Sequence, residues 1–354
     1  MSYTAINNST DYFNTKLYEG NGSSPRSITG IGFQPDWTWT KNRDNTNGHG
    51  LFDAVRGYTT GKGLSTHNAN AEGSADAYGY LSSRDSDGYT MTQGGSGMTM
   101  NNTNGESYVS WNWLANGTGV SNTDGSITST VSANTTSGFS IVSYTGSGSS
   151  PSTVGHGLGE VPKMIILKSR SVSVDWQVYH QSLGNATKII LNSTGASSAT
   201  SNWNSTSPTS SVFTINGTAS GAPDASGEDL IAYCFAEKTG FSKFGSYTGN
   251  GNADGTFVYT GFKPAFIMVK PSSIGNEAWK LYDNKRNIFN VVENGLNASD
   301  SQVEGSGSGN YIDFLSNGFK LRTNDTRQNG SGATNIYMAF AEEPLVGDNP
   351  ATAR

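Results

Sequence analysis

Apolar residues along this chain occur in short runs or in alternation with polar residues, and stretches rich in Gly, Ser, Thr and Asn separate these segments. The apolar segments are rich in β-branched and aromatic residues, which favours strands. No window sustains the periodicity of an amphipathic helix. The pattern therefore predicts an all-β protein whose many short strands are joined by turns.

One part of this pattern occurs three times. Each copy contains a Tyr-x-Gly-x-Gly segment, a proline that precedes an apolar strand, and a lysine 6 residues after that proline. These residues are Tyr18, Pro35 and Lys41 in the first copy, Tyr144, Pro162 and Lys168 in the second, and Tyr247, Pro264 and Lys270 in the third. Such regular spacing predicts internal repeats.

The repeats divide the chain into three homologous units in tandem. We expect units at residues 1–118, 119–239 and 240–345, followed by an extended tail at 346–354. The first unit is diverged and carries an insert at 57–83. Each unit is predicted to be an antiparallel β-sandwich of the jelly-roll or lectin-like kind, because alternation dominates and the prolines fit strand starts.

The Tyr-x-Gly-x-Gly segment is superficially similar to a phosphate-binding loop. Such a loop opens a helix and is closed by Lys and Ser or Thr. Here the residues after the glycines predict another strand instead. We therefore expect the glycines to permit a tight hairpin, with the Tyr packed over it and no nucleotide bound.

Two acidic residues occupy matching places in the first and third units. Asp53 and Asp283 are each followed three residues later by an arginine, Arg56 and Arg286, and the middle unit has His180 at this place. The repetition favours a structural ion pair. Glycoside hydrolysis needs two carboxylates at a defined separation, and matching positions in separate units do not predict one.

Composition and charge narrow the possible partners. The net charge of -6 includes no run of Lys or Arg, which argues against binding to nucleic acid or an anionic membrane. The single cysteine, Cys234, excludes a disulfide framework within the chain, and the 4 histidines stand too far apart for a zinc site. No Gly-x-Ser-x-Gly elbow provides a nucleophile. We expect no enzyme activity, no metal and no cofactor.

Aromatic residues divide into those matched between the units and those that are not. The matched rings are expected to fill the sandwich interiors, and they include Trp111, Trp113, Trp176, Tyr179, Trp279 and Tyr282. The unmatched candidates are Trp203, in a polar segment, and Tyr58, His67, Tyr78 and Tyr80, in the insert. Exposed rings among amides suit stacking on sugars, so these five residues form a hypothetical glycan-binding site. The alternative is an ordered loop packed on its own unit or on another subunit.

Two long segments carry a resemblance to a known family. The stretch "GSITSTVSANTTSGFSIVSYTGSGSSPSTVGHGLGEVPKMIILKSR" (Gly125–Arg170) resembles a repeat found in virion proteins of tailed bacteriophages, particularly phages of marine bacteria. The stretch "YCFAEKTGFSKFGSYTGNGNADGTFVYTGFKPAFIMVK" resembles the junction between two such repeats. The resemblance extends from about Phe13 to Glu343. The first unit departs from it, with "YEGNG" and "WNWLANG" in place of the usual segments.

This resemblance implies a structural virion protein, such as a tail fibre, a tail-associated component or a head decoration, with no catalytic residue. We expect it to be made in the cytoplasm of a bacterial host, to form a homo-oligomer and to contact other virion proteins. The alternatives are a receptor-binding protein whose unmatched loops contact host surface glycan, a capsid decoration protein and, least favoured, a polysaccharide depolymerase.

Overall fold

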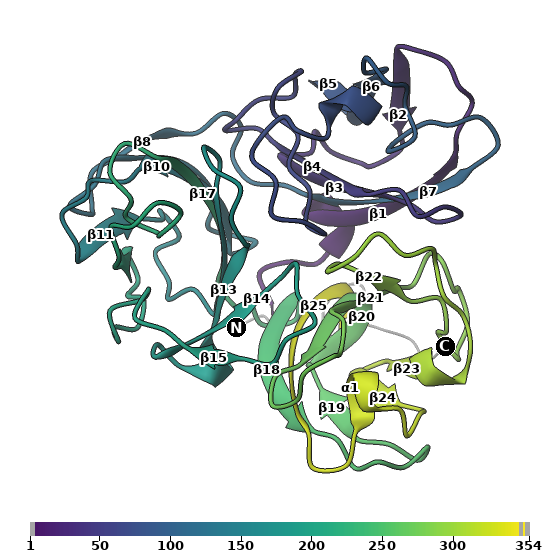
Figure 1. Cartoon of the computed structure of the whole chain (residues 1–354). Helices are drawn as coiled ribbons and strands as arrows, with labels where there is room; N and C mark the ends of the chain where they lie inside the picture. Colours follow the sequence, from purple (N-terminus) through teal and green to yellow (C-terminus); the bar gives the residue numbers. More distant parts are fainter. Residues whose placement is uncertain (1–3, 347–349, 351–354) are drawn as a thin grey trace.

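The computed structural model describes residues 4–346 and residue 350, and this part of the chain is all-β as predicted. Its strands form three lobes, residues 4–118, 119–239 and 240–346, which surround a common centre (Figure 1). The helical elements are the α-helix α1 (Thr326–Asn329) and the 3₁₀ turns η1 (Ser9–Asp11), η2 (Asp76–Tyr78), η3 (Gln181–Leu183) and η4 (Ser308–Asn310). Most of the tail expected at 346–354 lies outside the described residues.

The strands are short and spread over all three lobes. The first lobe contains β1 (Phe13–Glu19), β2 (Arg26–Thr29), β3 (Trp37–Asn42), β4 (His49–Asp53), β5 (Tyr80–Asp85), β6 (Gly88–Thr92) and β7 (Ser107–Trp113). The second contains β8 (Val120–Asn122), β9 (Ser129–Asn134), β10 (Phe139–Thr145), β11 (Ser152–Gly155), β12 (Met164–Ser169), β13 (Gln177–His180), β14 (Thr187–Ile190), β15 (Ser198–Ala199), β16 (Val212–Ile215) and β17 (Asp229–Phe235). The third contains β18 (Ser242–Thr248), β19 (Phe257–Tyr259), β20 (Phe262–Pro271), β21 (Lys280–Asp283), β22 (Leu296–Asn297), β23 (Ile312–Leu315), β24 (Gly318–Leu321) and β25 (Thr334–Pro344).

Each lobe contains one large sheet and one small sheet. The large sheets have the strand orders β1-β7-β3-β4, β15-β14-β13-β12-β17-β10-β9-β8 and β18-β25-β20-β21-β22. The small sheets are β2-β6-β5, β11-β16 and β19-β24-β23. The three large sheets share one order of pairing. β1 pairs with β7, β7 with β3 and β3 with β4 in the first lobe, and the corresponding orders are β10-β17-β12-β13 in the second lobe and β18-β25-β20-β21 in the third.

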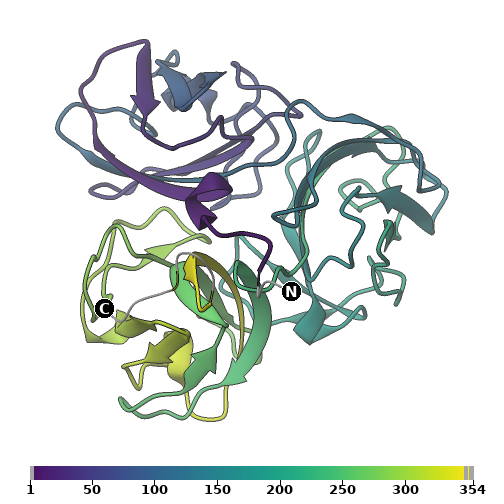
Figure 2. The ribbon, with the colours of Figure 1, turned by 180° about the vertical axis from the view of Figure 1, so that it is seen from behind.

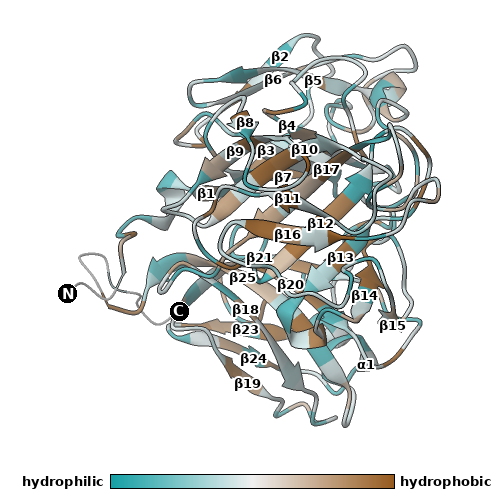
Figure 3. Ribbon diagram, turned by 90° about the vertical axis from the view of Figure 1, so that its left-hand side faces the viewer, coloured by the Kyte–Doolittle hydropathy of each residue, from teal (hydrophilic) through white to brown (hydrophobic). Residues whose placement is uncertain are grey.

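The large sheet of the second lobe is buried on both faces. Ile165 and Leu167 of β12 pack with Phe213 of the small sheet, inside the lobe. Met164 and Ile166 point the other way and join the cluster shared with the other lobes. A strand buried on both faces is continuously apolar rather than alternating. In Figure 3 the strands at the middle of the molecule accordingly carry most of the hydrophobic colour.

Aromatic rings from all three lobes meet in the common centre, which the lobes also surround in the opposite view (Figure 2). The ring centroid of Phe235 in the second lobe lies 5.8 Å from that of Trp37 in the first and 6.1 Å from that of Phe340 in the third. Trp113 of the first lobe lies 5.7 Å from Phe340. Burial of large rings stabilises the contact between lobes as it does a domain core.

This centre corrects one prediction about the matched rings. Four of them contact another lobe and do not fill a sandwich interior, namely Trp111, Trp113, Trp176 and Trp279. They lie on the face of each large sheet that points away from its small sheet. Tyr179, in contrast, lies inside the second lobe as predicted.

A ring N–H of each lobe donates a hydrogen bond to a backbone carbonyl of the preceding lobe. The three bonds run from Trp176 to Ser65 (2.9 Å), from Trp279 to Ile190 (2.9 Å) and from His49 Nε2 to Asn297 (2.8 Å). His49 Nδ1 accepts from the Trp39 indole, so the neutral imidazole carries its proton on Nε2. The third bond joins the first lobe back to the last, and the contacts therefore form a closed ring.

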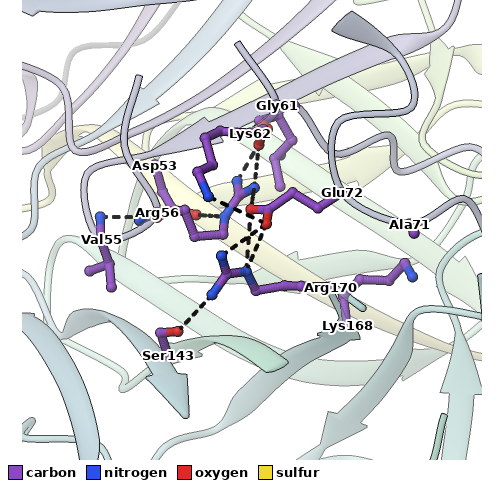
Figure 4. A network of polar contacts seen from close by, with 12 residues as sticks. Asp53, Val55, Arg56, Gly61, Lys62, Ala71, Glu72, Ser143, Lys168 and Arg170 are labelled. Atoms are coloured by element: carbon purple, nitrogen blue, oxygen red, sulfur yellow. Dashed lines mark hydrogen bonds and ion pairs between the residues drawn. The ribbon is translucent and has the colours of Figure 1, made fainter. Parts of the chain in front are cut away.

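A buried cluster of charges also joins the first lobe to the second. Arg56 donates to Asp53 (2.5 Å) and to Glu72 (3.0 Å), both in its own lobe. Arg170 of the second lobe donates to the same Glu72 (2.9 Å), and the Tyr233 hydroxyl donates to Asp53 (2.7 Å). Figure 4 shows Arg56 and Arg170 on either side of Glu72. Shared carboxylates in this cluster fix the two lobes in one relative position.

The third and first lobes meet through a matching cluster. Arg286 donates to Asp283 (2.6 Å) and to Glu304 (2.9 Å). Arg43 of the first lobe donates to Glu304 (2.7 Å), and the Trp111 indole donates to Asp283 (3.0 Å). Both predicted ion pairs are thus confirmed, and each also receives a side chain from the next lobe.

Candidate functional site

The polar segment around Trp203 does not expose its ring, and this part of the hypothetical glycan site is wrong. Trp203 is 2% exposed, and its ring meets Tyr179 edge-on at 5.9 Å inside the second lobe. Asn204 and Ser205 follow with positive φ values of 50° and 48°. This turn leaves the neighbouring polar residues in solvent while the indole packs inside.

Two of the insert tyrosines also pack on the first lobe rather than facing solvent. Tyr58 is 8% exposed, its ring lies 6.2 Å from Phe52, and its hydroxyl lies 2.9 Å from Thr38 Oγ1. Tyr80 is half-buried and packs against the same core cluster. Neither ring presents a free face for a ligand, because the insert folds back as part of the lobe.

His67 and Tyr78, in contrast, lie together on the wall of a cavity of about 250 Å³. The cavity is built from three segments of the first lobe: the loop between β3 and β4, the insert, and the segment before β7. Its lining residues are Thr46, Asn47, Gly48, Ser65, His67, Asn68, Asn70, Ser74, Ala75, Tyr78, Thr99 and Met100. Of the five predicted residues, these two form a candidate site.

The His67 ring is fixed by its neighbours. The backbone N–H of His49 donates to His67 Nδ1 (3.2 Å), and His67 Nε2 lies 3.1 Å from the Asn68 amide. Gly48 makes room for the ring, since a Cβ on Gly48 would lie 2.2 Å from His67 Cε1. Desolvation, together with the nearby charge of Lys41, lowers the pKa of His67 to about 4. The imidazole is therefore neutral near pH 7.

No charged side chain lines the cavity. The nearby ammonium of Lys41 is buried and donates to the carbonyls of Asn42 (2.5 Å) and Asn45 (3.3 Å). The lining instead combines amides and hydroxyls with the ring of Tyr78, which is 52% exposed, and the buried thioether of Met100. Such a surface suits an uncharged polar ligand better than an anion or a cation.

The hairpins predicted at the Tyr-x-Gly-x-Gly segments are wrong. Each segment instead leads from a strand of the large sheet (β1, β10 or β18) to a strand of the small sheet (β2, β11 or β19), and each is held against a second loop. The three tyrosine hydroxyls donate to backbone carbonyls, Tyr18 to Asn101 (2.8 Å), Tyr144 to Pro223 (2.9 Å) and Tyr247 to Gln328 (2.6 Å). A Cβ on the first glycine of each segment would lie 1.9–2.3 Å from a carbonyl oxygen, at Gly20, Gly146 and Gly249. The close approach requires glycine, so the segment is structural.

The three repeated lysines are buried, and their ammonium groups bind backbone carbonyls. Lys168 Nζ donates to the carbonyls of Ser169 (2.7 Å) and Val172 (3.3 Å), and Lys270 Nζ donates to that of Thr194 in the second lobe (3.0 Å). Desolvation by burial lowers the pKa of each of the three lysines to about 8. These lysines tie loops together and do not reach solvent.

Three further features concern metal ligands, membrane-spanning helices and the single cysteine. Among residues 4–346 and 350, no group of three or more His, Cys, Asp or Glu side chains is placed to hold a metal ion. Within the same residues, no helix has the length and apolar character needed to span a membrane. Cys234 is buried, and burial raises the pKa of its thiol.

Comparison with known proteins gives a family without an assigned function. Residues 8–344 match the family described as Domain of unknown function (DUF7483). The chain belongs to this family. The match spans all three lobes. No curated protein and no solved structure matches the chain.

Proposed function

We propose first that the three lobes are tandem homologous β-sandwich repeats. The same pairing order of four strands in each large sheet supports this. So do the matching hydrogen bonds of Tyr18, Tyr144 and Tyr247, which all end on a loop near the closing strand. Unrelated sandwiches would have no reason to share these local contacts.

We propose further that the protein is a non-enzymatic structural component of a tailed-phage virion, working as a homo-oligomer through contacts between subunits. The resemblance of Gly125–Arg170 to repeats of virion proteins supports a role in the virion. The observation that carries the subunit contact is an apolar loop on the third lobe, formed by Ile288, Phe289 and Val291, which are 63%, 72% and 37% exposed. Adjacent large apolar side chains left in solvent mark an interaction surface.

The apolar loop is a feature of the third lobe. It lies between β21 and β22, directly after the Asp283–Arg286 ion pair. At the corresponding place of the first lobe, Arg56 is followed by Gly57 and the buried Tyr58. The second lobe continues with polar residues after Leu183. Within residues 4–346, this loop places Ile288 and Phe289 next to each other in solvent, and we propose that it meets a second copy of the chain.

Light scattering tests the subunit contact. The wild-type protein should have a mass that is an integer multiple of the chain mass, and Ile288→Ser with Phe289→Ser should reduce it to that of one chain. Tyr259→Ser is the matched control, because Tyr259 is also exposed (53%) on the third lobe but lies outside the loop. A monomeric wild-type protein would contradict the proposal.

Electron microscopy of gold-labelled protein mixed with phage particles tests the virion role. Labelling of one kind of position on tails or fibres is expected. Labelling over the capsid faces would support a head decoration protein instead. Failure to label any particle would reject the virion role while leaving the oligomer test unaffected.

A further inference from the structure

We propose that the cavity of the first lobe binds a neutral saccharide, with Tyr78 stacking on the sugar ring and the amides of Asn47 and Asn70 binding its hydroxyl groups. This inference does not rest on the virion role. The site retains His67 and Tyr78 of the hypothetical glycan site, whereas Trp203 and Tyr58 are buried elsewhere.

The cavity lies near His49, at a place where the first lobe differs from the other two. The paired register ends with Gln177 opposite Leu167 in the second lobe and with Lys280 opposite Val269 in the third. Trp176 and Trp279 directly precede these last pairs, whereas His49 of the first lobe lies opposite Lys41. The smaller imidazole keeps the hydrogen bond to the neighbouring lobe. Beside it stand Gly48, without a side chain, and His67 of the insert. The first lobe thus has an imidazole where the other two have an indole, and the cavity lies next to it, against Gly48 and His67.

Several polar side chains that line the cavity make no hydrogen bond among the described residues. Among the described residues, no hydrogen-bond partner is found for the side chains of Thr46, Asn47, Asn70 and Tyr78, and all four line the cavity. These groups supply amide donors, amide acceptors and hydroxyls at one opening. Adjacent hydroxyl groups of a sugar need both kinds of partner.

The lining of the cavity combines the aromatic ring of Tyr78 with the apolar side chain of Met100. Tyr78 is exposed at the rim, and Met100 is 3% exposed at the wall. A sugar offers apolar C–H faces as well as hydroxyls, so a ring beside amides matches both of its surfaces. A cavity of about 250 Å³ has room for a single sugar unit, with the rest of a longer chain in solvent.

The absence of charged side chains from the lining indicates an uncharged ligand. The cavity has no Lys, Arg, Asp or Glu in its lining, and the neighbouring Lys41 ammonium is turned onto carbonyls. A phosphorylated or carboxylated ligand would lose its hydration without gaining an ion pair. The neutral state of His67 gives the same preference. We therefore assign an uncharged hexose or N-acetylhexosamine unit as the ligand.

The test is saturation-transfer NMR with a panel of glucose, galactose, mannose, N-acetylglucosamine and N-acetylgalactosamine, followed by titration of the sugar that responds. Tyr78→Ala and Asn70→Ala should each weaken binding by about tenfold. Tyr259→Ala is the matched control, because Tyr259 (53%) and Tyr78 (52%) are almost equally exposed. It should bind like the wild type.

A second variant fills the cavity from the backbone. Gly48→Ala places a Cβ against the His67 ring and should displace it, which abolishes sugar binding. Thermal unfolding of the Tyr78 and Asn70 variants should be unchanged, since both side chains are exposed and their loss does not affect packing. No response from any sugar at millimolar concentration would overturn the proposal, and so would equal binding by wild type and Tyr78→Ala.

Discussion

The hydroxyl of Tyr233 in the second lobe donates a hydrogen bond of 2.7 Å to the carboxylate of Asp53 in the first lobe, which already holds Arg56. Asp283 stands in the same relation to Trp111 at the junction of the third and first lobes. A buried carboxylate in each case receives both an arginine of its own lobe and a donor of the next. Folding of a lobe and its attachment to the neighbour therefore depend on the same side chain.

We expect Tyr233→Phe to lower the free energy of unfolding by about 1–3 kcal/mol, because a buried carboxylate loses one donor. Asp53→Ala should cost more, about 3–5 kcal/mol, because it leaves Arg56 buried without its closest partner. Urea denaturation followed by tryptophan fluorescence measures both. Tyr259→Phe, at an exposed position, is the control and should be neutral. A neutral Tyr233→Phe would show that the bond between lobes does not stabilise the fold.

Gly146→Ala should destabilise the second lobe, because the added Cβ would lie 2.1 Å from the Ala225 carbonyl oxygen. Overpacking of this kind costs about 1–3 kcal/mol. Gly95→Ala is the matched control, since no atom lies within 4 Å of its added Cβ and its φ is not positive. Thermal unfolding should separate the two variants. Equal melting temperatures would reject the structural role of the Tyr-x-Gly-x-Gly segment.

Acid should destabilise the protein between pH 6.5 and about 4. Burial lowers the pKa of His180 and of His67 to about 4, so in this range the unfolded chain binds more protons than the folded one. The free energy of unfolding therefore decreases as the pH is lowered, by about 1.4 kcal/mol per pH unit for each such histidine. His180 Nδ1 accepts the Ser182 N–H, a bond that protonation removes.

His180→Gln tests this origin of the acid sensitivity. The variant lacks one titrating group, so its stability should change less steeply over the same pH range, by about 1.4 kcal/mol per unit. Denaturant midpoints measured at several pH values give the slopes. Parallel slopes for wild type and variant would show that His180 does not titrate on unfolding.

Phe340→Ala should weaken all three lobes and not only its own. Phe340 contacts rings of the first and second lobes in the common centre, and loss of a buried Phe costs about 3–5 kcal/mol. Hydrogen exchange should increase in all three large sheets together. The control is Phe257→Ala, since Phe257 is 46% exposed on the third lobe and lies outside the apolar loop. Faster exchange confined to the third lobe would mean that the lobes unfold independently.

Strand content and the local role of the repeated residues could be predicted from the sequence, because they depend on short-range pattern. The alternation and the Asp-x-x-Arg pairs each involve residues close along the chain. The glycines of the Tyr-x-Gly-x-Gly segments, in contrast, approach carbonyls of loops far away in the sequence, and their predicted hairpins are not formed. Packing between lobes depends on which face of a sheet meets another lobe. The signal for it was present in "KMIILK", whose unbroken apolar run is typical of a strand buried on both faces.

Only part of the candidate site could be predicted, because the polarity of a segment does not determine which of its side chains point into solvent. Polar neighbours suggested that Trp203 is exposed, but a two-residue turn is enough to direct one ring inward. Tyr78 and His67 were found because they lie in an insert with no counterpart. Asn47 and Thr46 come from a loop between two strands of the repeat, and nothing in their local sequence distinguishes them from other turn residues.

The closed ring of contacts between lobes limits the number of lobes that one chain can hold. Each lobe has one face that donates a ring N–H and one that offers a carbonyl, and a circle of three leaves neither face unused. A fourth lobe of the same kind would find no free partner unless the circle opened. Extension of such a chain by further lobes is therefore self-limiting, and larger assemblies must be built from the outer surfaces of finished molecules.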